Sequence, residues 1–228
     1  IRVLLGSRIQ LNMKAHWITY FERSRALGGR FGQEQHWGGL SIGTAFKSAL
    51  RPAEERERGF HNMEWGVLWG FAPGENDERS FFQGWYNQSG LYLPVPRVHV
   101  TTDLQVGVSW GSSAPLYQRF YMGGFTRNYL FRNHHAPLVG HSDQAYWGDF
   151  LKSGTIGLNY RLYRQASLGV LLSAGHLSSA SFFDSETPIR LGSGIVAGYT
   201  LDRIGPVRVG LLTDFKSMRP ALSVGHVF

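Results

Sequence analysis

The chain has 228 residues with a formal net charge of +7, and it contains 29 Gly, 7 Trp, 10 Tyr, 15 Phe and no Cys. The absence of Cys excludes disulfides and thiolate metal sites, and no run approaches the roughly 18 consecutive apolar residues of a membrane helix. The mean hydropathy of -0.20 is low, as expected of strands that carry an apolar residue only at every second position.

Alternating stretches, each bounded by Gly, Pro or charged clusters, recur at short and regular intervals along the whole chain. They predict an all-β protein of twelve antiparallel strands in one domain, because no internal repeat or linker interrupts them. Sixteen strands would need more chain, so we expect either a twelve-stranded sheet or part of a sixteen-stranded one. The predicted strands are 2-14, 16-30, 36-50, 60-73, 79-93, 97-111, 116-125, 145-164, 166-179, 189-203, 205-216 and 219-228.

Three of the later strands show the alternation most clearly. Ile156, Leu158, Tyr160 and Leu162 share one face of 145-164, and the strands 166-179 and 205-216 are patterned alike. An Arg facing lipid at the bilayer midplane costs about 2–4 kcal/mol, so charged side chains on the second face require a polar interior. The alternation therefore assigns five residues to the interior, namely Asn159, Arg161, Ser173, Arg208 and Asp214.

The last ten residues end on an aromatic side chain, with Leu222, Val224, His226 and Phe228 on one face. Such a terminal strand is typical of bacterial outer-membrane β-barrels. The sequence thus predicts a transmembrane β-barrel in the bacterial outer membrane, with these four residues as its assembly signal. We expect contact with outer-membrane lipid, with lipopolysaccharide and with the barrel assembly machinery. Because the chain begins Ile1-Arg-Val, without Met or a signal peptide, we expect a mature or trimmed segment.

Four short motifs in the second half resemble one family of barrels. These are Met122-Gly-Gly-Phe-Thr-Arg-Asn-Tyr-Leu-Phe-Arg-Asn133, Gly157-Leu-Asn-Tyr-Arg161, Leu172-Ser-Ala-Gly-His176 and Leu201-Asp-Arg-Ile-Gly-Pro-Val-Arg-Val-Gly210. In order and spacing they resemble the BamA superfamily of outer-membrane assembly and translocation proteins. The likeness is greatest to the barrel of bacterial patatin-like outer-membrane proteins.

This resemblance implies a long loop at 126-143 that folds into the lumen, with Arg127, Tyr129 and Arg132 as its anchors. The family's loop-tip Arg pairs with acids on the next strands, but here the matching positions are Asn159 and Ser173, which are uncharged. The resemblance also implies a barrel that anchors or translocates an upstream domain. A patatin-type Gly-x-Ser-x-Gly elbow is absent from these residues, so we expect no such catalysis in this segment.

Two other functions stay open at this point. His176 and Ser178 are two residues apart on one strand face, the spacing of an outer-membrane lipid hydrolase or deacylase, although the acids Asp184 and Glu186 fall in a predicted loop. A small passive channel is the other alternative.

The remaining His residues and the basic charge suggest no further ligand. His134, His135, His141 and the nearby Asp143 could supply a zinc-type site, but adjacent His side chains on an extended backbone diverge, so we expect a solvated loop and neither metal nor cofactor. The net charge of +7 comes without any nucleic-acid motif, so no nucleic acid is expected as a partner.

Overall fold

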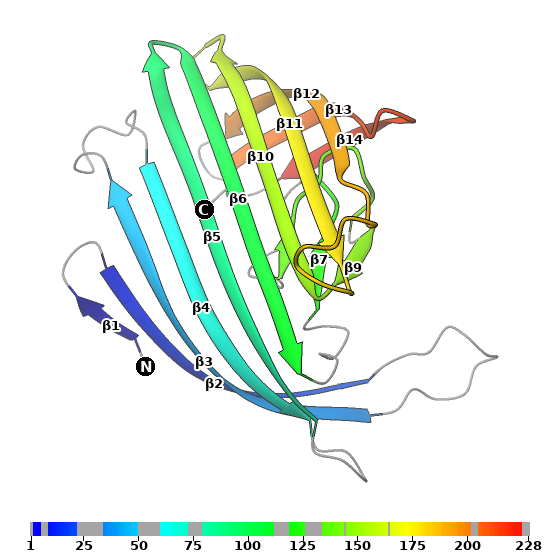
Figure 1. Cartoon of the computed structure of the whole chain (residues 1–228). Helices are drawn as coiled ribbons and strands as arrows, with labels where there is room; N and C mark the ends of the chain where they lie inside the picture. Colours follow the sequence, from blue (N-terminus) through cyan, green and yellow to red (C-terminus); the bar gives the residue numbers. More distant parts are fainter. Residues whose placement is uncertain are drawn as a thin grey trace.

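The residues that the structure describes form β-strands joined by turns and irregular connections, as Figure 1 shows. This computed structural model describes residues 2–5, 9–21, 34–49, 60–72, 79–111, 119–125, 134–143, 145–163, 165–201 and 205–224. Within these ranges no helix combines the length and apolar character needed to cross a membrane.

Eleven strands form one antiparallel sheet, which we call the wall. Each strand pairs with the next along the chain, except that β6 pairs directly with β10. The strands are β1 (Arg2–Leu5), β2 (Ile9–Phe21), β3 (Glu34–Ala49), β4 (Phe60–Ala72), β5 (Arg79–Val95), β6 (Val98–Gly111), β10 (Phe150–Arg161), β11 (Ala166–Ser178), β12 (Arg190–Leu201), β13 (Gly205–Thr213) and β14 (Met218–Val224).

A second, three-stranded sheet lies within the curve of the wall, and we call it the inner sheet (Figure 1). Its central strand β7 (Phe120–Met122) pairs parallel with β8 (His135–Ala136) and antiparallel with β9 (Tyr146–Gly148). All three strands come from the stretch between β6 and β10. The chain therefore leaves the wall after β6, builds the inner sheet, and returns to the wall beside the strand that it left.

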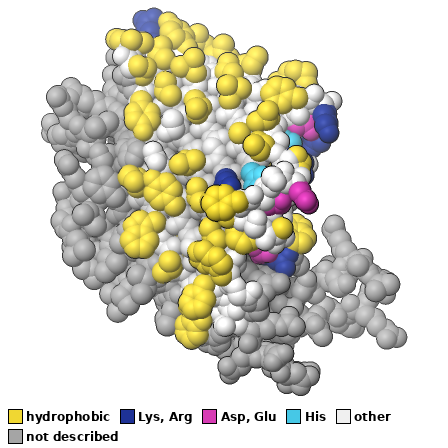
Figure 2. Space-filling model, viewed as in Figure 1, with side chains coloured by type: hydrophobic (Ala, Val, Ile, Leu, Met, Phe, Trp, Pro, Cys, Tyr) yellow, Lys and Arg dark blue, Asp and Glu magenta, His cyan; other side chains and the backbone are white. Residues whose placement is uncertain are grey.

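The two faces of the wall differ in chemistry. The inner face, on part of which the inner sheet packs, carries buried polar side chains such as Gln83, Asn87 and Gln105. The outer face carries large apolar side chains that are exposed, for example Ile156 at 58% and Ile195 at 58%. Figure 2 shows hydrophobic side chains spread over the described part of this outer face.

The exposed apolar side chains come from every wall strand whose side chains the structure describes. They include Trp65, Val67 and Trp69 of β4, Phe82 and Tyr92 of β5, Leu104 and Trp110 of β6, Ile156, Leu158 and Tyr160 of β10, Leu168, Val170 and Leu172 of β11, Leu191, Ile195 and Tyr199 of β12, Val209 and Leu211 of β13, and Leu222 and Val224 of β14. Because side chains alternate along a strand and the register keeps like faces together, these residues form one continuous surface.

The predicted strands need three corrections. The break predicted between 2-14 and 16-30 lies inside β2, because the chain turns earlier, between β1 and β2. The segment 116-125 is not a wall strand, since β6 and β10 pair with each other and leave no place between them. Likewise, 145-164 is two strands, β9 in the inner sheet and β10 in the wall. The wall thus has eleven strands instead of twelve, and its edge strands β1 and β14 are not paired with each other, so the described sheet is open.

Candidate functional site

A pair of glycines from the Met122–Asn133 motif directly follows β7, the first strand of the inner sheet. Gly123 and Gly124 have φ angles of 144° and 78°, a backbone conformation that residues with a Cβ rarely adopt. The Gly123 amide donates to the carbonyl of Ala136 over 3.0 Å, and the Leu138 amide donates to the carbonyl of Gly124 over 3.1 Å. We call residues 134–143 the inner segment. These bonds hold residues 119–125 against the inner segment.

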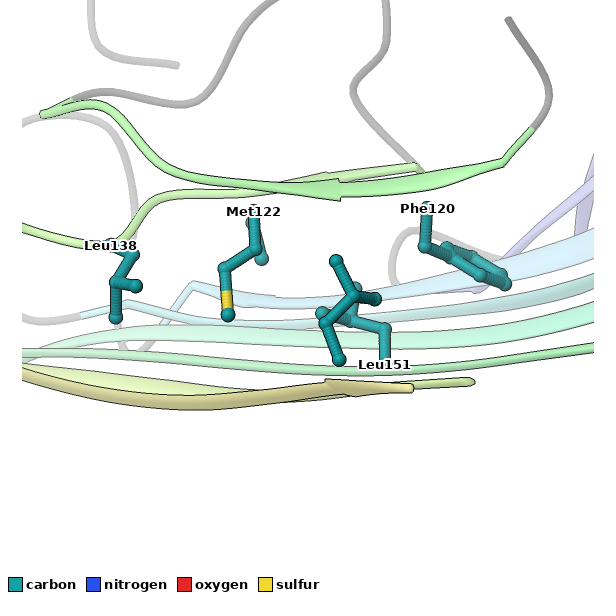
Figure 3. Close-up of a cluster of buried hydrophobic side chains, with 6 residues drawn as sticks. Phe120, Met122, Leu138 and Leu151 are labelled. Carbon is teal, nitrogen blue, oxygen red and sulfur yellow. The ribbon is translucent and has the colours of Figure 1, made fainter. Parts of the chain in front are cut away.

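The side chains of β7 pack onto glycines of the wall. Phe120 and Met122 are fully buried and point toward the wall, while Leu151 of β10 points back toward them, as Figure 3 shows. A Cβ on Gly107 of β6 would overlap the Phe120 ring, and a Cβ on Gly175 of β11 would overlap the Met122 sulfur. Because Gly107 and Gly175 have no side chains, the wall leaves space at these positions, and the side chains of β7 fill it.

The inner segment is also hydrogen-bonded to the wall. The Val139 amide donates to Ser173 Oγ over 2.9 Å, and the Ser173 hydroxyl donates to the Gly192 carbonyl over 3.4 Å. Both bonds are buried, so their loss would leave polar groups without water. One serine of β11 thereby ties the inner segment to two wall strands.

Contacts of the inner segment continue across the wall as far as its last strand. Gly140, at φ 82°, lies so close to Thr213 that a Cβ would overlap the backbone of that residue. The Arg219 guanidinium of β14 donates from Nη1 to Ser142 Oγ over 2.8 Å. Together with the packing of β7, these contacts join the inner sheet to β6, β10, β11, β12, β13 and β14.

Three histidines of the inner segment have separate surroundings. His135 is fully buried, with Nε2 3.2 Å from the exposed Asp143 carboxylate. His141 contacts the Tyr146 hydroxyl through Nδ1 and the Leu191 carbonyl through Nε2, each at 3.0 Å. The His134 ring packs against Trp85 and Phe120. In the part of the chain that the structure describes, no three His, Cys, Asp or Glu residues are grouped to hold a metal ion.

Cationic and aromatic side chains meet where the inner sheet joins the wall. The Arg119 guanidinium lies 4.5 Å from the centroid of Trp147, and that of Arg190 lies 3.8 Å from the centroid of Tyr146. Burial raises the pKa of Asp149, which follows β9, and the charge of Arg119 opposes this rise. The Arg190–Tyr146 pair joins β12 of the wall to β9, and the Arg119–Trp147 pair joins β9 to the residue before β7.

The residues predicted to face the interior have different positions. By register, Asn159, Ser173 and Arg208 lie on the inner face of the wall, as does Arg161 at the end of β10. Asp214 lies instead in the turn after β13, where its Oδ1 accepts hydrogen bonds from the amides of residues 216 and 217. These bonds lower the Asp214 pKa to about 2. Asp214 is a turn cap, because β13 ends at residue 213.

The predicted loop anchors Arg127, Tyr129 and Arg132 lie outside the described residues. The same is true of His226 and Phe228 in the predicted assembly signal. The other two residues of that signal, Leu222 and Val224, lie on the outer face and are exposed.

His176 and Ser178 lie on the outer face, at the end of β11, and both are buried. The Ser178 hydroxyl donates to Asp184 Oδ2 over 2.6 Å, and the same carboxylate accepts bonds from the Thr187 hydroxyl and the Glu186 amide. These bonds, led by that from Ser178, lower the pKa of Asp184. A carboxylate with a lowered pKa is a poor general base.

Within the described part of the chain, neither ring nitrogen of His176 has a hydrogen-bond partner. The arrangement therefore lacks the serine–histidine bond of an activated nucleophile. Sequence spacing correctly placed His176 and Ser178 on one face, but it gave no sign that Asp184 folds back onto Ser178.

Comparison with known proteins adds no family to this geometry. No protein-family model matches the chain, and no curated protein is significantly similar to it.

Proposed function

We propose that the chain forms the wall of an outer-membrane barrel. The observation that carries this proposal is the continuous apolar surface on the outer face, which is far larger than the apolar patches that soluble monomers expose. Lipid would cover this surface, and lipopolysaccharide would contact it in the outer leaflet. The open edges at β1 and β14 mean that closure requires either pairing of these two strands or additional strands.

The inner sheet would then plug the interior. Its bonds and contacts extend from β6 to β14, so it fills the concave side of this half of the wall. A passive channel is less consistent with an inner face occupied in this way. The barrel assembly machinery would recognise the outer-face residues of β14 and insert the wall into the membrane.

We further propose that the barrel anchors or translocates an associated upstream domain. This role rests on the resemblance of the Met122–Asn133, Gly157–Arg161, Leu172–His176 and Leu201–Gly210 motifs to the BamA superfamily and to patatin-associated barrels. The proposal assigns no chemistry to the wall. The lipid-hydrolase alternative is not adopted, because the Ser178 hydroxyl is bonded to Asp184 and not to His176.

Two neighbouring substitutions in β10 test the membrane wall. Ile156 lies on the outer face and Thr155 on the inner face, directly opposite Asp103 of β6. Ile156→Arg should lower the free energy of unfolding in lipid vesicles by about 2–4 kcal/mol, whereas Thr155→Arg should cost much less. Equal losses for the two variants would contradict a lipid-facing outer surface.

The anchoring role needs a separate measurement on the native protein. Intact mass and amino-terminal sequencing of the protein purified from outer membranes should give a larger species with an upstream domain. A species that begins near Ile1 would contradict the anchoring role and favour a self-contained barrel. A Ser178→Ala variant should leave membrane lipid composition unchanged, and loss of a lipid hydrolysis product in it would restore the enzyme hypothesis.

A further inference from the structure

Lys152 is exceptional on the outer face. Among the wall residues of β4 to β14 whose side chains are described, it is the only charged side chain on that face. Its strand neighbours on the same face are Phe150 and Gly154, and the wall beyond is apolar. An unpaired cation against lipid costs several kcal/mol unless it reaches the interface or a counter-charge.

Among the residues that the structure describes, no carboxylate pairs with Lys152. Its described contacts are with two aromatic rings, at 4.1 Å from Nζ to the centroid of Phe182 and 5.2 Å to that of Phe183. Both rings belong to the connection between β11 and β12, and Phe183 is 86% exposed. The nearby Asp184 carboxylate is already bonded to Ser178, Thr187 and the Glu186 amide.

His176 lies directly opposite Lys152 on β11. Opposite side chains of an antiparallel pair have Cβ atoms about 4.5–5.5 Å apart, so a ligand held by Lys152 lies beside the His176 ring and contacts its buried nitrogens once the side chains that cover them move. His176 is only 8% exposed, yet no described residue forms a hydrogen bond with either of its ring nitrogens. Buried polar groups are normally bonded, so this ring nitrogen pair is unusual in a folded protein.

We propose that Lys152 and His176 bind the phosphate group of a membrane lipid. This inference rests on the proposed membrane wall. Lys152 is the third residue of β10, at the end of the sheet where the long connections emerge, which is where a bilayer presents its headgroups. The ammonium supplies charge and up to three donors, and the imidazole supplies a further donor. Phe182 and Phe183 suit the same depth, because aromatic side chains concentrate at the bilayer interface.

Binding is measured by native mass spectrometry of the full chain refolded in detergent micelles. The probes are a phosphatidylglycerol, a phosphorylated lipid A and, as the lipid without phosphate, a diacylglycerol of matched acyl chains. Lys152→Met should weaken binding of both phosphorylated lipids roughly five- to tenfold, and Lys152→Arg should keep it. His176→Phe should weaken it by a smaller factor. Lys216→Gln, in the β13–β14 turn at the same end of the wall, is the matched control and should bind normally.

Several results would overturn the lipid-phosphate site. These are unchanged binding by Lys152→Met, an equal loss in Lys216→Gln, and binding of the diacylglycerol as tight as that of the phosphorylated lipids. Competition by millimolar inorganic phosphate with equal loss of both lipids would assign the site to a free anion instead. Lys152→Met replaces a charge by an apolar chain of similar length, so it should fold, and a heat-dependent gel shift checks this.

The same samples separate this inference from the proposed function. If the wild-type protein does not insert into lipid vesicles, the membrane wall fails and the lipid site fails with it. If the wild type inserts and Lys152→Met binds lipid normally, only the lipid site fails.

Discussion

Removing the Met122 side chain should separate the inner sheet from the wall more than any comparable substitution on the outer face. Met122 is fully buried between β7 and the wall, in a cluster with Phe120, Leu138 and Leu151. Truncation of a buried Met to Ala loses the burial of its apolar atoms and leaves a cavity, at a cost of about 2–5 kcal/mol. Because β7 is short, we expect this loss to exceed the local stability of the inner sheet.

Met218→Ala is the matched control, because Met218 is 68% exposed on the outer face of β14. Its truncation removes no contact with the inner sheet and should change the free energy of unfolding in detergent by less than about 0.5 kcal/mol. The assay compares urea unfolding of the two variants in one detergent, together with proteolysis of the inner segment. Equal effects of the two substitutions would refute the packing of β7 on the wall.

A second substitution tests the same contact from the other side. A Cβ on Gly175 would overlap the Met122 sulfur, so Gly175→Ala should destabilise the wild-type protein. In the Met122→Ala background the space is free, and Gly175→Ala should cost less. The coupling free energy between the two sites should be about 0.5–3 kcal/mol, and additive effects would show that they do not touch.

Two further changes test the polar contacts. Ser173→Ala leaves a buried amide of the inner segment without an acceptor and should cost about 1–3 kcal/mol in urea unfolding, whereas Ser193→Ala, on the outer face of β12, should cost little; similar losses would count against the anchor. Asp184 has a lowered pKa, so its bonds stabilise the β11–β12 connection above its unfolded pKa of about 4, and this stability is lost as the pH falls through the lower folded value. Protection factors of the amides of residues 179–189, which correct for the slower intrinsic exchange at acidic pH, should therefore fall on acidification in the wild type. In Asp184→Asn they should already be low at pH 7 and change little, and equal wild-type protection at pH 7 and pH 2 would contradict this.

Local pattern was sufficient to predict which face a residue occupies in the wall. Ile156, Leu158 and Tyr160 are exposed on the outer face, while Ser173 lies on the inner face, as alternation requires. The pattern was insufficient to say which sheet a strand joins. Phe120–Met122 alternates like a wall strand, yet its partners are β8 and β9. It cannot join the wall, because β6 and β10 pair directly with each other.

The candidate site was less accessible to sequence reasoning. The Gly-Gly pair was noted only within the motif that resembles the family's loop, so its positive φ angles were not predicted. Ser173 was predicted to face the interior, but the bond that it accepts from the Val139 amide depends on contact between distant segments. The resemblance predicts a loop at 126-143 that enters a lumen, and residues 134–143 pack on the inner face of the wall. The predicted anchors Arg127, Tyr129 and Arg132 lie outside the described residues. The sequence does not single out Lys152, because a single cation in a strand is unusual only when the surface around it is known to be apolar.

The direct pairing of β6 with β10 has a consequence for how the protein reaches its native state. In every other pair of neighbouring wall strands, the two strands follow each other directly along the chain. Pairing of β6 with β10 must instead bring together two strands that are separated by residues 112–149. Closing so long a loop in place of a four-residue turn costs roughly 2 kcal/mol of chain entropy, at about 0.6 kcal/mol for each doubling of length. The packing of Phe120 and Met122 into the glycine positions of β6 and β11 can offset that cost only once both halves of the wall are adjacent. The two hairpin arrays on either side of this junction are therefore expected to form early, and their union with the inner sheet to be the slow and cooperative step.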